Sequence, residues 1–238
     1  MNPEWSMPAL QNYPYLLSTL IGAAIVVAVY LLVSKERRIM LIGGAALVPF
    51  SFCAILHETS YWNAGRLGGF SWGIEDALFT FSVGSLTAAI GARVLQLDLP
   101  VRIQWQSAAK KFILLCFSAT ILIIMLTLAG MDIMFATIIA QIAVTALLTA
   151  ANRHSWWRPS LASLIYTSYY TVMLYIFFHR VGGFADLWNG PHLWPARIFG
   201  LPLEEIIWVF TFAWCWVLML AFCLDTKISV KEELHESA

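Results

Sequence analysis

Two pairs of adjacent carboxylates are the residues of this sequence best suited to chemistry. Glu204 and Glu205 stand where an aromatic loop meets the last apolar segment, and Glu75 and Asp76 stand in a similar position in the first half of the chain. An ionisable side chain at or inside a membrane segment is energetically costly, so it indicates a functional site. The acids could instead only cap their helices, but the same pattern in two places favours a function.

Aromatic residues follow each acid pair at helical spacing. Adjacent residues on a helix point about 100° apart, so only one acid of each pair can face a given cavity. Along one face, Glu204 aligns with Trp208, and Glu75 aligns with Phe79 in the same way. The helix N-terminus favours a carboxylate, whereas burial beside a second acid favours the protonated form. If burial prevails, a neutral carboxyl can protonate an alkene, and nearby rings can stabilise the carbocation.

The composition is that of an integral membrane protein. Of 238 residues, 60% are hydrophobic and 12% are charged, with a mean hydropathy of +0.75. The formal net charge is zero, so nothing electrostatic favours nucleic acid as a partner. The four cysteines fall in apolar stretches without metal-like spacing and are interpreted as core residues. Because no basic region precedes the first apolar run, we expect that run to be a retained span rather than a signal peptide.

Seven apolar runs are long enough, or nearly so, to cross a bilayer as helices. The expected spans are 14–34, 39–57, 75–97, 112–130, 133–151, 160–179 and 203–224. Lysine and arginine concentrate on one side of this layout, and the other side receives only Arg66, Arg180 and Arg197. The positive-inside rule then predicts an extracytoplasmic N-terminus, a cytoplasmic C-terminus, and both acid pairs near the extracytoplasmic face.

The order of features in the first three spans recurs in the last three. Each triplet contains a basic turn, then a loop rich in glycine and tryptophan, then the span that begins with the acids. This predicts an all-α integral membrane fold of seven transmembrane helices, built as two parallel three-helix repeats joined by a linker helix (3+1+3). The corresponding segments are an N-terminal extracytoplasmic segment, the first repeat, the linker with the fourth helix, the second repeat and a cytoplasmic tail, at residues 1–13, 14–100, 101–131, 132–226 and 227–238.

Further candidates flank the acids. The aromatic side chains expected to bind substrate are Trp208, Phe79, Trp62, Trp188 and Tyr169. The side chains that could set the protonation of an acid or orient the loops are His57, His179, Asn63 and Asn189. A metal site formed by His57, His179, His192 and Asp186 is not expected, because their spacing matches no ligand pattern.

On these residues the chain resembles the integral-membrane carotenoid lycopene cyclases of the heterodimeric or fused type, found in some bacteria, archaea and fungi. The resemblance is carried by residues 202–205 (PLEE) and, more weakly, by 73–76 (GIED), and it is supported by the two loops; it covers nearly the whole chain. It implies cofactor-free, redox-neutral cyclisation of lycopene ends to ionone rings: protonation of the terminal double bond, ring closure, then loss of a proton. Glu204 and Glu205 are the first candidates for this chemistry, followed by Glu75 and Asp76.

Some positions depart from the family pattern and keep other functions open. Gly73 stands where the family usually has proline, Asp76 where it usually has glutamate, and His57 near a common aspartate. A cyclase or hydratase acting on another isoprenoid is therefore an alternative. A SWEET-like transporter is an alternative from a different class, although it would require several broken spans and Pro49 is alone at mid-span. The expected partners are a lipophilic isoprenoid substrate and membrane lipid, with a homo-oligomer possible and no cofactor, because no dinucleotide-binding motif occurs.

Overall fold

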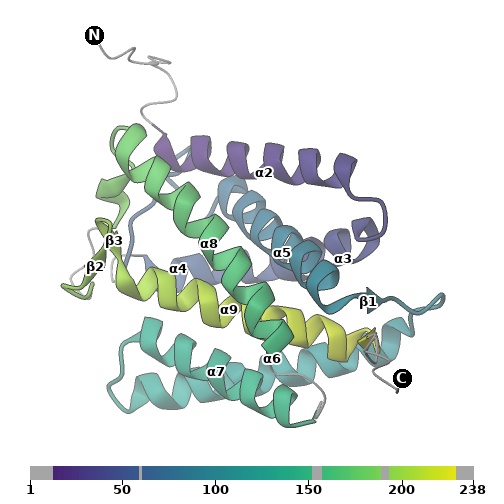
Figure 1. Ribbon diagram of the computed structural model, residues 1–238. Coiled ribbons are helices and arrows are strands. Elements are labelled where there is room, and N and C mark those ends of the chain that lie inside the picture. Colours follow the sequence, from purple (N-terminus) through teal and green to yellow (C-terminus); the bar gives the residue numbers. More distant parts are fainter. Residues whose placement is uncertain (1–12, 59–60, 152–156, 189–192, 229–238) are drawn as a thin grey trace, which may run out of the picture.

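The fold is an assembly of long helices with almost no sheet (Figure 1). The computed structural model describes residues 13–58, 61–151, 157–188 and 193–228. Its helices are α2 (Pro14–Leu32), α3 (Arg37–Leu47), η1 (Val48–Cys53), α4 (Ala54–His57), α5 (Ile74–Leu95), α6 (Trp105–Leu128), α7 (Ile133–Ala151), α8 (Trp157–Arg180), η2 (Ala185–Leu187) and α9 (Leu203–Cys223). Taking α3, η1 and α4 as one span, seven helices in the described residues are long and apolar enough to cross a membrane, which confirms the all-α, membrane-compatible prediction.

The fourth span begins earlier than the sequence predicted. The helix starts at Trp105 rather than at 112, so that predicted boundary was wrong. Lys110 and Lys111 lower the local hydropathy without breaking the helix. The ammonium group of Lys111 pairs with Asp225 beyond the end of α9 and donates to the carbonyl of Phe222 at 3.4 Å. The first turns of α6 are thus a charged helix end, which a hydropathy criterion excludes.

The second span changes helix type in its middle. Six residues of 3-10 helix, Val48–Cys53, separate α3 from α4. Pro49 lies at the start of this segment, and proline both lacks an N–H donor and clashes with the preceding turn of an α-helix. The loop between α4 and α5 packs against this 3-10 segment. Its Trp72 donates the indole N–H to the Ser51 hydroxyl at 2.9 Å and stacks on Phe52 at 4.7 Å between ring centroids.

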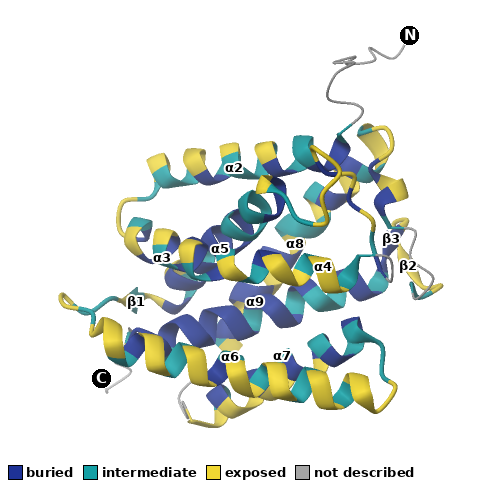
Figure 2. Ribbon diagram, turned by 180° about the vertical axis from the view of Figure 1, so that it is seen from behind, coloured by how far each residue is buried: buried dark blue, intermediate teal, exposed yellow. Residues whose placement is uncertain are grey.

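Helices α5 and α9 form the centre of the assembly, and Figure 2 shows them as its most continuously buried elements. Helix α5 packs against α2, α3, α8 and α9, and α9 also contacts α6, α7 and α8. Small residues permit the closest approach, as is usual between membrane helices. A Cβ on Gly43 of α3 would lie 2.5 Å from the Cβ of Ala88 of α5, and one on Gly91 of α5 would lie 2.4 Å from Val217 of α9.

Short β-pairings and loop contacts place the two acid pairs at one end of the bundle. Strands β1 (Leu97–Asp98) and β4 (Lys227–Ile228) pair antiparallel just beyond the C-terminal ends of α5 and α9. At the other end of the bundle, the loop between α4 and α5 meets the loop between α8 and α9, where the backbone N–H of Asn63 donates to the carbonyl of Leu187 at 2.7 Å. Strands β2 (Arg197–Ile198) and β3 (Leu201–Pro202) form a hairpin that leads directly into α9. Both acid pairs therefore lie in N-terminal turns beside the joined loops.

Candidate functional site

A largely apolar cavity of about 380 Å³ lies within the helical assembly. Asp76 from α5 and Glu205 from α9 line it, whereas Glu75 and Glu204 are not among its lining residues. This agrees with the expectation from helix geometry that one acid of each pair faces a given cavity. The five predicted aromatic side chains also line it: Trp208, Phe79, Trp62, Trp188 and Tyr169. In both helices the cavity-facing acid precedes the aromatic residue by three positions, rather than the four predicted.

Glu205 is held by neutral hydrogen-bond donors. The Tyr61 hydroxyl donates to Oε2 at 2.8 Å, and the Tyr170 hydroxyl donates to Oε1 at 2.7 Å. The residue is 5% exposed, and no ion pair of the described residues includes it. The indole nitrogen of Trp188 is buried beside this carboxyl without forming a hydrogen bond of good geometry. Burial, reinforced by the nearby Glu205, raises the pKa of Tyr61 far above its ordinary value, so this hydroxyl remains a donor.

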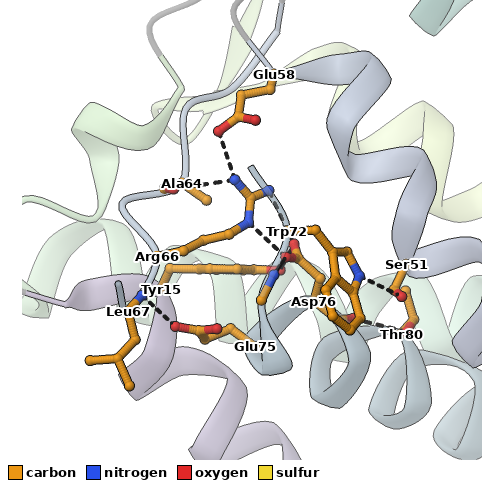
Figure 3. Close-up of polar contacts among 11 residues, drawn as sticks. Tyr15, Ser51, Glu58, Ala64, Arg66, Leu67, Trp72, Glu75, Asp76 and Thr80 are labelled. Carbon is orange, nitrogen blue, oxygen red and sulfur yellow. Dashed lines mark hydrogen bonds and ion pairs between the residues drawn. The ribbon is translucent and has the colours of Figure 1, made fainter. Parts of the chain in front are cut away.

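Asp76 is held by a cation instead (Figure 3). Arg66 donates through Nε to Oδ2 at 2.6 Å and through Nη2 to Oδ1 at 3.2 Å. The Tyr15 hydroxyl donates to Oδ1 at 3.0 Å, and the backbone N–H of Gly73 donates to Oδ2 at 2.8 Å, as in a helix cap. With four donors, this carboxylate has its charge compensated and its acceptor sites filled.

The guanidinium of Arg66 is buried together with Asp76, whereas its other partner, Glu58, is partly exposed. Its second ion pair joins Nη1 to Oε1 of Glu58 at 2.7 Å, next to the carbonyl of Ala64 (Figure 3). Burial acts to lower the pKa of Arg66, but the hydrogen bonds and charge of Asp76 outweigh it and raise that pKa. Arg66 therefore stays charged, and this loop cluster carries a permanent buried cation.

The first acid of each pair connects a loop to a helix start. Glu75 Oε1 accepts the backbone N–H of Leu67 at 2.6 Å, and Glu204 Oε1 accepts that of Trp194 at 2.7 Å. Both side chains are buried, and in each the other carboxyl oxygen has no hydrogen-bond partner among the described residues. The two halves thus use their first acid in the same way, to position the loop that precedes the helix.

The predicted histidines and asparagines separate in the structure. His57 lines the cavity, and its Nδ1 lies 3.0 Å from the carbonyl of Cys53. His179 is exposed and does not line the cavity, and its ring contacts that of Tyr175. Asn63 is exposed and contributes the backbone contact between the loops, whereas Asn189 and His192 lie outside the described residues. Within the described part of the chain, no group of three or more His, Cys, Asp or Glu side chains is placed to hold a metal ion.

Sequence reasoning missed four residues that determine the environment of the acids: Tyr15, Tyr61, Arg66 and Tyr170. Arg66 offered one signal, as one of only three basic residues on the side of the acids. Tyr61 immediately precedes Trp62, but its partner Glu205 is 144 positions away in the chain. Tyr170 is one of several tyrosines in its span, and no charged neighbour in the sequence singles it out.

Comparison with models of known protein families, with curated proteins and with solved structures found no match. Function must therefore be inferred from the cavity and from the acids that line it. The arrangement combines a buried carboxyl that has no cationic partner among the described residues, an apolar space in front of it and several aromatic side chains around that space. Such a combination suits proton donation to an apolar substrate and stabilisation of a cation formed there.

Proposed function

We propose that the protein is a membrane isoprenoid cyclase in which Glu205 protonates the substrate. The substrate that we propose first is lycopene, which reacts at its end groups. The single observation that carries this proposal is the environment of Glu205, which lines an apolar cavity and is hydrogen-bonded by two tyrosines. An ionised carboxylate buried away from any cation is strongly disfavoured, so such a group keeps its proton. A neutral carboxyl facing an alkene is the acid that this reaction requires.

The surrounding side chains suit the cation that follows protonation. Trp208, Trp62 and Tyr169 line the same cavity as Glu205. The face of an aromatic ring attracts a cation, and the attraction grows where water is excluded. The same apolar lining limits access of water, which would otherwise trap the carbocation as an alcohol.

The size and opening of the cavity suit one end of a long hydrocarbon. A volume of about 380 Å³ is at the small end of ordinary ligand pockets, so it fits an end group better than a whole carotenoid. The lining includes exposed side chains, Leu56 on α4 and Thr120 on α6, so the cavity extends to the outer surface of the bundle. The rest of a polyene can then lie along the hydrocarbon core, which is roughly 30 Å thick.

The finer architecture is part of the same proposal. We infer two parallel three-helix repeats around linker helix α6, because in each triplet the third helix packs against the first two: α5 against α2 and α3, and α9 against α7 and α8. The basic-residue asymmetry supports an extracytoplasmic N-terminus and a cytoplasmic C-terminus. We propose that the protein uses no cofactor and that its partners are an isoprenoid substrate and membrane lipid. The proposal is compatible with a homo-oligomer.

Expression in cells that accumulate lycopene tests the proposal. Cyclised carotenoids should appear on chromatography with the unaltered chain and should disappear with Glu205→Gln, at equal membrane abundance. Unchanged lycopene would refute the carotenoid assignment, and a panel of other isoprenoids would then test the broader cyclase proposal. A hydroxylated product would identify a hydratase. No conversion of any isoprenoid, together with uptake of a small solute, would favour the transporter alternative.

A further inference from the structure

We infer that Glu205 both gives the proton that starts the reaction and takes back the proton that ends it, and that Tyr61 and Tyr170 are positioning residues that stabilise its carboxylate between the two steps. The chemistry of this inference rests on the proposed function, but the geometry does not. Tyr61 comes from the first long loop and Tyr170 from α8, so two separate elements converge on one carboxyl of α9.

The two hydroxyls are divided between the two carboxyl oxygens, one at 2.8 Å and one at 2.7 Å. When Glu205 is protonated, its hydroxyl oxygen can still accept a hydrogen bond while its own proton points elsewhere. When Glu205 has lost its proton, both hydroxyls become donors to a charged acceptor, and such bonds are about twice as strong as neutral ones. The arrangement therefore stabilises the carboxylate more than the acid without adding a fixed cation. The buried Trp188 indole N–H beside it is a third donor available to the charged form.

The proton balance of the reaction closes on this one group. Protonated Glu205 transfers its proton to the terminal double bond, leaving a carboxylate and a carbocation. The neighbouring double bond attacks that cation, forming the ring bond and moving the positive charge to another ring carbon. The carboxylate then removes a proton from a carbon beside the new cation, whose C–H electron pair becomes the ring double bond. Glu205 is again neutral, and no oxidant, reductant or cofactor is consumed.

The other polar groups of the cavity are less suited to take the final proton. Asp76 is the only other acidic side chain among the described residues that line the cavity, and its oxygens already accept four donors, including the Arg66 guanidinium. His57 also lines the cavity, so it is the rival base that an experiment has to test. Its Nδ1 is directed to the carbonyl of Cys53 within its own helical span.

Infrared spectroscopy of the full chain in lipid vesicles tests the geometry without any substrate. The carbonyl stretch of a protonated carboxyl is distinct from carboxylate bands, and Glu205→Gln identifies the one that belongs to Glu205. Removing a donor should shift that band to higher frequency in Tyr61→Phe, in Tyr170→Phe, or in both, and furthest in the double variant. Tyr175→Phe is the matched control, because Tyr175 lies on α8 like Tyr170 but is 45% exposed and does not line the cavity. Absence of a Glu205 band, or a band that neither tyrosine variant moves, would overturn the inference.

Turnover measurements test the return of the proton. Tyr61→Phe and Tyr170→Phe should each lower turnover by about 10- to 100-fold, the usual effect of losing a hydrogen bond to a charged group, while Tyr175→Phe should not. His57→Gln should slow turnover less than either tyrosine variant and should give the same ring. A loss as complete as that of Glu205→Gln would assign the final step to His57 and refute the dual role. Failure of the unaltered chain to cyclise any isoprenoid would refute the proposed function instead, and the infrared result would stand by itself.

Discussion

The two acid pairs occupy equivalent places in their helices but have different partners. Glu75 and Glu204 each accept a backbone N–H from the preceding loop. The second acids differ: Asp76 is paired with Arg66, whereas Glu205 is hydrogen-bonded only by tyrosine hydroxyls among the described residues. A compensated carboxylate holds structure together, whereas the carboxyl in the apolar cavity that lacks a cation among the described residues is the one that we propose gives a proton. The difference teaches that the motif places an acid, whereas side chains from the first loop and from neighbouring helices supply the partners of that acid.

The largest difference in turnover between the two sites should appear when Glu205 and Asp76 are neutralised one at a time. Glu205→Gln removes the proposed proton donor, so we expect turnover to fall by about 10²- to 10⁴-fold, the usual contribution of general acid catalysis. Asp76→Asn removes a charge that Arg66 compensates, so its effect should appear mainly as lower stability. Product formation per folded protein, measured in membranes that contain the isoprenoid substrate, separates the two outcomes.

Equal losses in both variants would contradict this division of roles. Glu204→Gln serves as the neighbouring control, since it changes the same residue type one position away and outside the cavity lining. Greater loss in Asp76→Asn than in Glu205→Gln, at equal amounts of folded protein, would move the proton donor to the first half of the chain.

The second prediction removes the cation that distinguishes the two sites. Arg66→Met leaves Asp76 and Glu58 without their buried partner, and breaking a buried ion pair in this way typically costs about 3–5 kcal/mol. For this variant in detergent micelles, we expect unfolding at a correspondingly lower midpoint concentration of denaturant. Glu205→Gln should lower that midpoint far less, because it leaves no charge unpaired.

A compensating variant sharpens this test. Arg66→Met combined with Asp76→Leu replaces the Arg66–Asp76 ion pair by apolar groups and should recover part of the stability, because only the partly exposed Glu58 then lacks its partner. If Arg66→Met alone were as stable as the unaltered protein, the cation would not be holding the loop, and the contrast between the sites would lose its basis.

The spans were predictable because a membrane helix must satisfy its own backbone hydrogen bonds, which leaves long apolar runs in the sequence. Helix geometry also predicted that one acid of each pair faces the cavity. It could not identify which one, because the rotation of α5 and α9 about their axes depends on packing against other helices. The sequence places Arg66 only on the side that has few basic residues and gives no sign of its burial, yet it is 4% exposed. Its burial, like the Tyr61–Glu205 bond, arises from how the loops fold over the helix ends.

A third prediction concerns what the two sites share. Glu75→Gln and Glu204→Gln each replace the carboxyl that accepts a backbone N–H by an amide, so each should lower stability by about 1 kcal/mol. Because both acids make the same kind of contact, the two losses should be similar in denaturant unfolding. A loss confined to one variant would show that the first acids are not equivalent. A loss of turnover as great as that of Glu205→Gln would assign them a direct chemical role.

The smallest effect is expected from Tyr15→Phe, which is the counterpart of the two tyrosine variants at Glu205. Asp76 would lose one donor and keep the Arg66 guanidinium and the Gly73 N–H. The expected change is about 0.5 kcal/mol in the free energy of unfolding, the low end for a hydrogen bond because the other donors remain, with little change in turnover per folded protein. Tyr61→Phe removes the same type of group from Glu205, which has no cation beside it in the part of the chain that the structure describes. Comparable losses of turnover in Tyr15→Phe and Tyr61→Phe would mean that the hydroxyls act alike at both acids, so that Arg66 does not set the two sites apart.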